Sequence, residues 1–311
     1  MTRPKKDSEK KPRTPTLPTF LQDIKEQIDD IAVSEASKTN YKTGLNKLAN
    51  STKSSIYKDI ITILGNISNT NSKHTFISQI KSLYKHVEDF KNLFTATQLR
   101  HFDDLFDELR MKKLEKTTNR EATEKQKERH IEWSELHENI NELNNPIEKM
   151  IYGLYTLQPP LRSDYGEVRI LHSEDVEDEM LDGENVYTYD TGEFIIQSFK
   201  TAGTHDPIVW VVNNKLKKLI DDTNPSEREY LIFNYNKMTK NEPVSSNYLG
   251  HKIQDIMEKI YGKRISINDL RHSFVKEYNI TNTEYNEVLR NAELMGSSIK
   301  TQISNYMKRD F

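Results

Sequence analysis

The chain has 311 residues, of which 34% are hydrophobic and 30% are charged, and it has a formal net charge of −3 and no cysteine. This length and composition predict a soluble, helix-rich protein with room for two domains, and the lack of cysteine excludes disulfides, thiolate zinc sites and cysteine nucleophiles. No run of about 18 to 20 apolar residues predicts a membrane span, and the first residues lack the apolar stretch of a secretory signal, so we expect an intracellular protein.

The first 18 residues are rich in lysine and proline, which predicts a flexible basic tail. Between residues 19 and 116 the apolar residues recur at helical spacing and predict a small bundle, with helices at 19–33, 37–49, 54–67, 75–90 and 96–110. Ser37 and either Asn71 or Ser72 stand where N-caps are expected. Residues 117–130 are so charged that we predict a solvated linker between two domains.

The second domain is predicted over residues 131–311. Two helical segments, 131–143 and 146–157, precede four short runs of strand-like residues at 166–171, 185–189, 193–199 and 207–212. Helical spacing returns at 213–222, 245–262, 266–278, 282–296 and 299–308. The fold class is therefore α+β: mainly α, with a small antiparallel β-sheet on a helical body.

Charge is segregated along the chain. Residues 172–185 carry seven acidic groups and no lysine or arginine, so the rest of the chain is net positive. Residues 36–58 carry no acidic group and contain five lysines, Lys38, Lys42, Lys47, Lys53 and Lys58. A phosphate backbone is a natural partner for such a stretch, whereas a simply solvated face is the alternative.

Arg271 lies within an apolar helical stripe formed by Ile267, Leu270, Phe274, Val275 and Tyr278. A guanidinium that is buried without a partner costs several kcal/mol, so Arg271 is expected to meet an anion. A structural carboxylate and a phosphate group are the two candidates.

Four segments stand in an order that bears on this choice. They are PPLRSDYGEV with Arg162, EFIIQSFKTAGTHDPIVW with Lys200, NDLRHSF with Arg271, and MGSSIKTQISNYMK, in which Tyr306 follows Ser297 by nine residues. In this order and spacing the segments resemble the tyrosine recombinases, the integrase family that includes the lambda-type integrases and the Cre and Xer enzymes. The stretches QPPLRSDY and FKTAGTH look closest to integrase-like proteins of virophages and large DNA viruses.

The resemblance implies a catalytic mechanism without metal, cofactor or ATP. Tyr306 would be the nucleophile and would form a covalent 3′-phosphotyrosine, which conserves the energy of the broken bond for resealing. The remaining catalytic residues that it implies are Arg162 and Arg271 on the phosphate, Lys200 as the proton donor to the leaving 5′ oxygen, and Asn268 and Ser297.

The last two of these residues depart from the family pattern, because Asn268 stands where histidine is usual and Ser297 stands where histidine or tryptophan is usual. Both can donate a hydrogen bond to a phosphate oxygen, but neither moves a proton at neutral pH. General acid–base assistance contributes roughly 10²- to 10⁴-fold, so a slowed enzyme is predicted. His272 points about 100° away from Arg271 around the helix, which argues against its replacing the missing imidazole. A core aromatic is the alternative for Tyr306.

The resemblance also implies partners. Residues 19–116 would form a core-binding domain that clamps double-stranded DNA, with contacts from Lys38, Lys42, Lys47 and Lys53, and protomers would associate on DNA as a dimer or tetramer. The predicted function is site-specific breakage and rejoining of DNA for integration of a viral or mobile genome. The expected location is on DNA, in a host nucleus or viral factory, or packaged in a virion. Alternatives are a type IB topoisomerase, a DNA-binding relative with weakened catalysis, and a helical scaffold without a nucleic-acid role.

Overall fold

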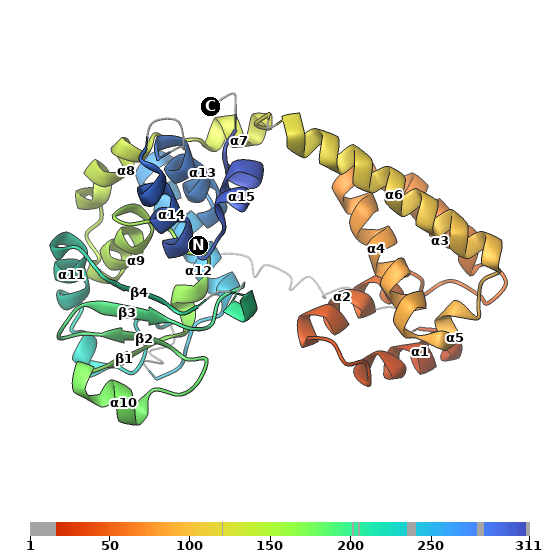
Figure 1. Ribbon diagram of the computed structural model, residues 1–311, viewed down its shortest axis with the longest axis horizontal. Helices are drawn as coiled ribbons and strands as arrows, with labels where there is room; N and C mark the ends of the chain where they lie inside the picture. The colour runs from red at the N-terminus through yellow and green to blue at the C-terminus, as the bar shows by residue number, and fades with distance from the viewer. Residues whose placement is uncertain are drawn as a thin grey trace, which may run out of the picture. The chain divides into compact units, whose positions relative to one another are not determined.

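The computed structural model describes residues 17–119, 121–200, 202–204, 206–234, 241–278 and 283–308. The chain divides into two compact units, Met1–Thr118 (unit 1) and Asn119–Phe311 (unit 2) (Figure 1). The predicted basic tail lies outside the described residues except for Leu17 and Pro18. Among the helices that the structure describes, none combines the length and the apolar character needed to cross a bilayer.

Unit 1 is a bundle of helices. They are α1 (Thr19–Asp29), α2 (Glu35–Asn46), α3 (Ile56–Asn66), α4 (Thr70–His86), α5 (Glu88–Lys91) and α6 (Ala96–Asn119, which ends one residue into unit 2). The expected N-caps are wrong: the side chain of Ser34 caps α2 and accepts from the Ser37 amide, and the side chain of Asn69 caps α4. An N-cap side chain accepts from the amides two or three residues later in the chain, so the position of the cap fixes the start of the helix. Both helices therefore begin about one turn earlier than predicted.

Helices α2 and α4 approach closely at Gly44. A Cβ on Gly44 would lie 2.7 Å from the Cβ of Gln79, which is closer than two carbon atoms pack. The buried side chain of Gln79 donates a hydrogen bond to Asn40 Oδ1 on α2 at 2.7 Å. Glycine is thus needed here for packing, although it weakens a helix interior.

Unit 2 contains short helices around a small sheet. The α-helices are α7 (Glu124–Arg129), α8 (Trp133–Glu138), α9 (Pro146–Thr156), α10 (Val176–Glu179), α11 (Asn214–Asp221), α12 (Ser246–Tyr261), α13 (Ile267–Glu277), α14 (Tyr285–Leu294) and α15 (Ile299–Thr301). Single 3₁₀ turns cover Asn139–Glu142, Asp164–Glu167, Ser173–Asp175, Ala202–Thr204 and Pro225–Glu227, and a π-helical turn covers Gln302–Tyr306.

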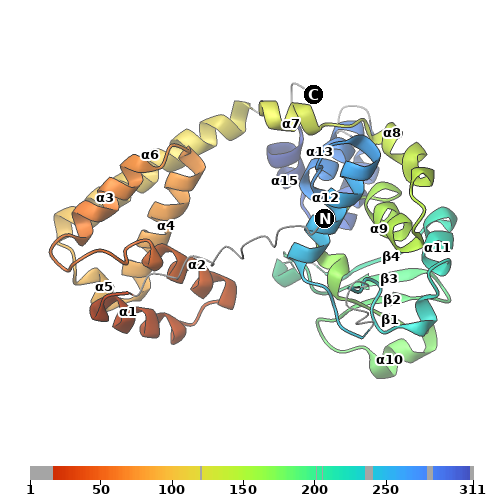
Figure 2. The same cartoon turned by 180° about the vertical axis from the view of Figure 1, so that it is seen from behind.

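The sheet has the order β1-β2-β3-β4, with strands Val168–Leu171, Asn185–Thr188, Glu193–Ile196 and Ile208–Val211. Strands β2, β3 and β4 are antiparallel neighbours, whereas β1 runs parallel to β2. The predicted α+β class is confirmed, but the sheet is mixed rather than wholly antiparallel. The connection between β1 and β2 covers residues 172–184 and contains α10, and two neighbouring parallel strands need a connection of about this length. Figure 2 shows α10 beside β1 from behind.

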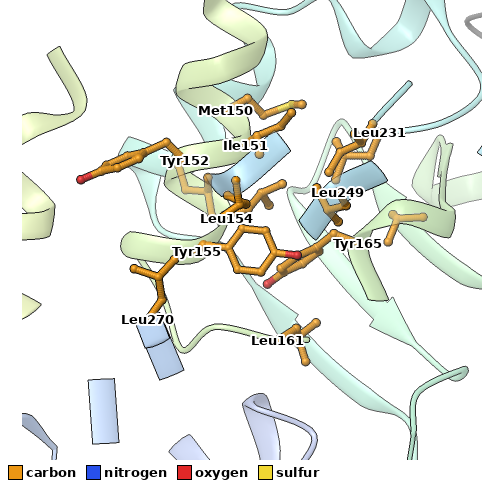
Figure 3. Close-up of a cluster of buried hydrophobic side chains, with 14 of the residues drawn as sticks. Met150, Ile151, Tyr152, Leu154, Tyr155, Leu161, Tyr165, Leu231, Leu249 and Leu270 are labelled. Atoms are coloured by element: carbon orange, nitrogen blue, oxygen red, sulfur yellow. The ribbon is translucent and has the colours of Figure 1, made fainter. Parts of the chain in front are cut away.

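The core of unit 2 holds the loop between α9 and β1 in place. Tyr155 and Tyr165 meet edge to face inside it, with ring centroids 5.4 Å apart, among leucines of several elements (Figure 3). The Tyr155 hydroxyl donates to the carbonyl of Arg162 at 2.8 Å, and Gln158 donates to the Tyr165 hydroxyl at 2.6 Å. Two buried aromatic side chains therefore fix the backbone on which Arg162 stands.

A buried carboxylate joins α9 to α12. Glu148 accepts from Lys252 at 2.8 Å and from Lys259 at 2.6 and 2.8 Å. Burial by itself would raise the pKa of Glu148, but the hydrogen bonds from the two lysines outweigh it and hold the pKa below its ordinary value of 4.5. These contacts tie the two helices together as long as the carboxylate is ionised.

Candidate active site around Arg271 and Tyr306

The placement of Arg271 starts at the N-terminus of α13. Ser266 and Asp269 form a reciprocal capping box there: the Ser266 hydroxyl accepts from the Asp269 amide, and the Asp269 carboxylate accepts from the Ser266 amide at 2.9 Å. With the start of the helix fixed, its apolar stripe packs into the core and carries Arg271 inward, so that only 1% of this residue is exposed.

The three nitrogens of the Arg271 guanidinium differ in their surroundings. Its Nε donates to the Tyr306 hydroxyl at 2.9 Å, its Nη1 donates to the carbonyl oxygens of Pro160 and Met295, and its Cζ lies 4.8 Å from the centre of the Tyr306 ring. Its Nη2 is buried and has no hydrogen-bond partner among the described residues. Burial lowers the pKa of Arg271, and the nearby Tyr306 opposes that effect. Every hydrogen-bond partner named is neutral, so within the described residues the guanidinium has no ion-pair partner.

The carboxylate expected under the structural alternative is not found in the described part of the chain. Neither Arg162 nor Arg271 forms an ion pair there. Asp164 lies close enough to influence Arg271, and burial raises the pKa of Asp164 while the two arginines lower it. The two guanidiniums also repel each other, and this repulsion by Arg162 lowers the pKa of Arg271. Two guanidiniums near a single carboxyl group carry an excess of positive charge, which favours an added anion.

Arg162 reaches the same place through the turn before α15. Its Nη1 donates to the carbonyl oxygen of Gly296 at 2.8 Å, and Met295, the preceding residue, is the one whose carbonyl binds Arg271. Gly296 has a φ of +58°, and a Cβ on it would lie 3.2 Å from Phe199. The turn is thus built around a glycine and delivers two successive carbonyls to the two predicted arginines.

Tyr306 lies at the end of a π-helical turn. The Met307 amide donates to the carbonyl of Gln302 at 2.9 Å, and the chain leaves the helix after Tyr306. Only 5% of Tyr306 is exposed. Its carbonyl oxygen lies 2.8 Å from Nδ1 of His272, and the two rings pack edge to face with centroids 5.2 Å apart. Both ends of the residue, hydroxyl and carbonyl, are therefore bound by neighbouring positions of α13.

The other predicted site residues are not gathered so closely. Lys200 is exposed in the connection between β3 and β4, and no hydrogen bond or ion pair within the described residues joins it to the two arginines or Tyr306. Asn268 is exposed, and its Nδ2 lies 3.4 Å from Nε2 of His272. Ser297 is buried and its hydroxyl lies 3.4 Å from the Ser298 carbonyl.

A cavity of about 980 Å³ separates the β3–β4 connection from α14 and the glycine turn. Phe199, Pro207 and Trp210 line it from the sheet side, and Arg290 and Ser297 line it from the helical side. Phe199, which directly precedes Lys200, therefore lies in the wall of this cavity, next to the turn at Gly296 that binds Arg162.

The lysines predicted to contact DNA lie on unit 1 and differ in their surroundings. Lys38 contacts the Asp29 carbonyl at 2.7 Å and the Glu35 carboxylate at 3.0 Å, and Lys42 pairs with the Asp29 carboxylate. Lys47 lies over the ring of Phe76 at 4.8 Å and Lys53 over that of Phe20 at 5.9 Å. Residues 36–58 contain no acidic group, but Asp29, which precedes this stretch and stands 13 residues before Lys42, neutralises the charge of Lys42.

Two residues of this site were not expected from the sequence. His272 and Arg271 point in different directions from α13, yet His272 also contacts Tyr306, through the carbonyl oxygen of that residue. This contact forms because the turn that ends at Tyr306 packs against α13. Gln126 lies in the segment predicted as a linker and contacts Nε2 of His272 at 3.2 Å. In the sequence, the place of His272 directly after Arg271 was the one reason to consider it as a site residue. No feature of the sequence indicated that Gln126 belongs to the site.

Comparison with known proteins adds little to this geometry. The crystal structure of XerA recombinase is similar over 94% of this chain and 94% of that chain, with 14% identity and a TM-score of 0.39. No protein-family model matches the sequence, and no curated protein matches it. Similarity at that level assigns neither family nor function, so the assignment rests on the site.

Proposed function

We propose that this chain breaks and rejoins DNA through a covalent 3′-phosphotyrosine at Tyr306. The observation that carries the proposal is the contact of a phenol with a buried guanidinium that has no ion-pair partner in the described structure: Arg271 Nε lies 2.9 Å from the Tyr306 hydroxyl, and Nη2 has no hydrogen-bond partner there. A buried charge without an ion-pair partner is costly, and such groups are typical of sites that bind an anion.

The reaction follows from these groups. The Tyr306 oxygen attacks the phosphorus of a DNA phosphodiester, a bond from phosphorus to the phenolic oxygen forms, and the bond to the 5′ oxygen breaks. The phenol loses its proton and the departing 5′ oxygen gains one. Attack by a 5′ hydroxyl on the phosphotyrosine reverses both steps and reseals a strand, so the exchange needs no external energy source.

Each remaining group has a role in this proposal. Arg271 and Arg162 hold the non-bridging oxygens, where negative charge increases in the transition state. Arg271 Nη2 is buried in the free protein, so the site must open for a phosphate oxygen to reach it. Lys200, which is exposed in the β3–β4 connection, protonates the 5′ oxygen. Asn268 and Ser297 contribute hydrogen bonds to the phosphate.

The larger assembly is also part of the proposal. Unit 1 binds the DNA duplex, with Lys47 and Lys53 as the predicted contacts that lack a carboxylate partner within the described residues. Protomers act in pairs on DNA, and the substrates are the ends of a mobile or viral genome. These statements rest on the sequence resemblance described above.

The test is the covalent intermediate itself. The purified full-length protein is incubated with a labelled pool of randomised duplexes, each nicked near its centre so that the short strand released by cleavage diffuses away. We expect a protein–DNA adduct that survives denaturation and is absent in Tyr306→Phe and Arg271→Met. Tyr285→Phe is the matched control, since Tyr285 is 65% exposed on α14.

The outcomes separate the alternatives. Without an adduct from the unaltered protein, the proposed chemistry is refuted, and salt-dependent binding of the same pool then indicates a DNA-binding protein without catalysis. An adduct together with relaxation of supercoiled plasmid by a monomer, without strand exchange, indicates a type IB topoisomerase.

A further inference from the structure

We propose that His272 is a positioning residue that holds the backbone of Tyr306 in place, and that Gln126 fixes the tautomer in which His272 does so. The inference rests on the proposed function, because it assigns the two residues to the control of that nucleophile. From its position on the helix, His272 was not expected to replace the missing imidazole of the family pattern.

The first step concerns the Tyr306 carbonyl. The last carbonyl groups of a helix have no partner within the helix and need one from elsewhere. The chain turns away after Tyr306, and the carbonyl oxygen of Tyr306 faces Nδ1 of His272 at 2.8 Å. A carbonyl oxygen only accepts hydrogen bonds, so Nδ1 must carry a proton. His272 thus caps the helical turn that ends with the nucleophile.

The second step concerns the other ring nitrogen. In a neutral imidazole with a proton on Nδ1, Nε2 is an acceptor and needs a donor. The side-chain nitrogen of Gln126 lies 3.2 Å from it. The orientation of this amide is set by α7, because its oxygen accepts from the amide and hydroxyl of Thr123 in a capping box, at 2.9 and 3.1 Å. The amide group is therefore directed at His272, and Asn268 adds a longer contact at 3.4 Å.

The charged groups around His272 agree with a neutral ring. Burial lowers its pKa, the Tyr306 carbonyl raises it, Lys308 and Arg271 lower it, and Asp269 raises it. Only 3% of the residue is exposed. Gln126 from α7 is uncharged, and among these effects the negative charge comes from Asp269.

The functional consequence is a chain of contacts from α7 to the nucleophile. Hydrogen bonds run from Gln126 through His272 to the backbone of Tyr306, whose hydroxyl lies on Arg271. A displacement of about 1 Å at a reacting group can cost on the order of 10²-fold in rate. Loss of the Nδ1 bond would therefore slow attack by the phenol without removing any group that touches DNA.

The first experiment reads the tautomer directly. Histidine ¹⁵N resonances of the full-length protein are assigned with a His272→Asn sample and followed through a pH titration, without DNA. We expect His272 to carry its proton on Nδ1 and to remain neutral at neutral pH. A proton on Nε2, or a cationic ring at neutral pH, overturns the inference whatever the protein does to DNA.

Gln126→Glu sharpens this experiment. A glutamate can keep the capping box, but it presents an oxygen instead of an NH₂ group to Nε2, so the pKa of His272 should rise by about 1 to 3 units. Gln98→Glu is the matched control, because Gln98 forms the same reciprocal contacts with Thr95 on unit 1. No rise in Gln126→Glu, or an equal rise in the control, refutes the assigned contact.

The second experiment tests positioning with the nicked duplex pool. We expect His272→Leu to form the covalent adduct about 10- to 100-fold more slowly than the unaltered protein, and His272→Asn to recover most of that loss, because its amide can donate from the place of Nδ1. Thermal unfolding of both variants shows whether they fold. Equal rates in the two folded variants refute the role of the Nδ1 bond. Absence of an adduct from the unaltered protein refutes the proposed function instead, and leaves the tautomer measurement as the test.

Discussion

Replacing Tyr306 by phenylalanine isolates one hydrogen bond of the site. The ring remains over the Arg271 guanidinium, while Arg271 Nε loses its acceptor at 2.9 Å and is left buried beside the already unpartnered Nη2. Hydrogen bonds to charged groups contribute about 1.5–3 kcal/mol, and a buried donor that loses its partner costs a similar amount. We therefore expect Tyr306→Phe to lower the free energy of unfolding of unit 2 by about 1.5–3 kcal/mol.

Urea unfolding followed by tryptophan fluorescence measures this change selectively. The chain has two tryptophans, Trp133 and Trp210, and both lie in unit 2. A unit of this size should lose about 3–12 °C in Tm for such a change. An equal slope with urea in both proteins shows that they expose the same surface on unfolding.

Tyr285→Phe again serves as the control, because its hydroxyl is on an exposed side chain and its removal should change the free energy by less than about 0.5 kcal/mol. A change that small in Tyr306→Phe would contradict the reasoning, since it would mean that the phenol does not lie on Arg271 in the free protein. This result is independent of any DNA substrate.

Three further predictions concern other parts of the chain. Gly296→Ala should destabilise unit 2 by about 1–3 kcal/mol in the same urea assay, because the positive φ disfavours a side chain and its Cβ would press on Phe199; an unchanged midpoint would contradict the description of the turn. In the folded protein the pKa of Glu148 lies below 4.5, so the stabilising effect of the ionised carboxylate is present above pH 4.5 and is lost as pH falls through the folded pKa. Glu148→Gln should therefore be less stable than the unaltered protein at neutral pH, and its stability should decline less steeply below pH 4.5. An equally steep decline in both proteins would count against the contacts of Glu148 with the two lysines. Combined Lys47→Ala and Lys53→Ala should weaken DNA binding and reduce the slope of log affinity against log salt by about 1.8, and an unchanged slope would place the phosphate contacts elsewhere.

Local sequence patterns predicted most elements of secondary structure. Helical spacing located the bundle of unit 1 and the helices that frame the sheet, and the alternating runs located all four strands. The patterns did not distinguish Ser34 from Ser37 as a cap, because several polar residues near a helix start can accept from its amides. They also did not reveal that β1 runs parallel to β2, since strand direction depends on how the connection through α10 crosses the sheet.

The sequence by itself determined that Arg271 would be buried, because its helical neighbours are apolar and must face a core. It also marked Arg162 and Tyr306 as its companions through the order of short motifs. These are properties of local spacing, which the chain carries wherever it folds.

Only the tertiary structure decided what these residues meet. Arg271 and Tyr306 are 35 positions apart, and Gln126 and His272 are 146 apart, so their contacts depend on packing that no local pattern contains. The same holds for Lys42, whose acidic partner comes from a different helix. Side-chain charge and helical face can be derived from neighbours in the chain, whereas a partner across the core is selected by the geometry of the whole unit.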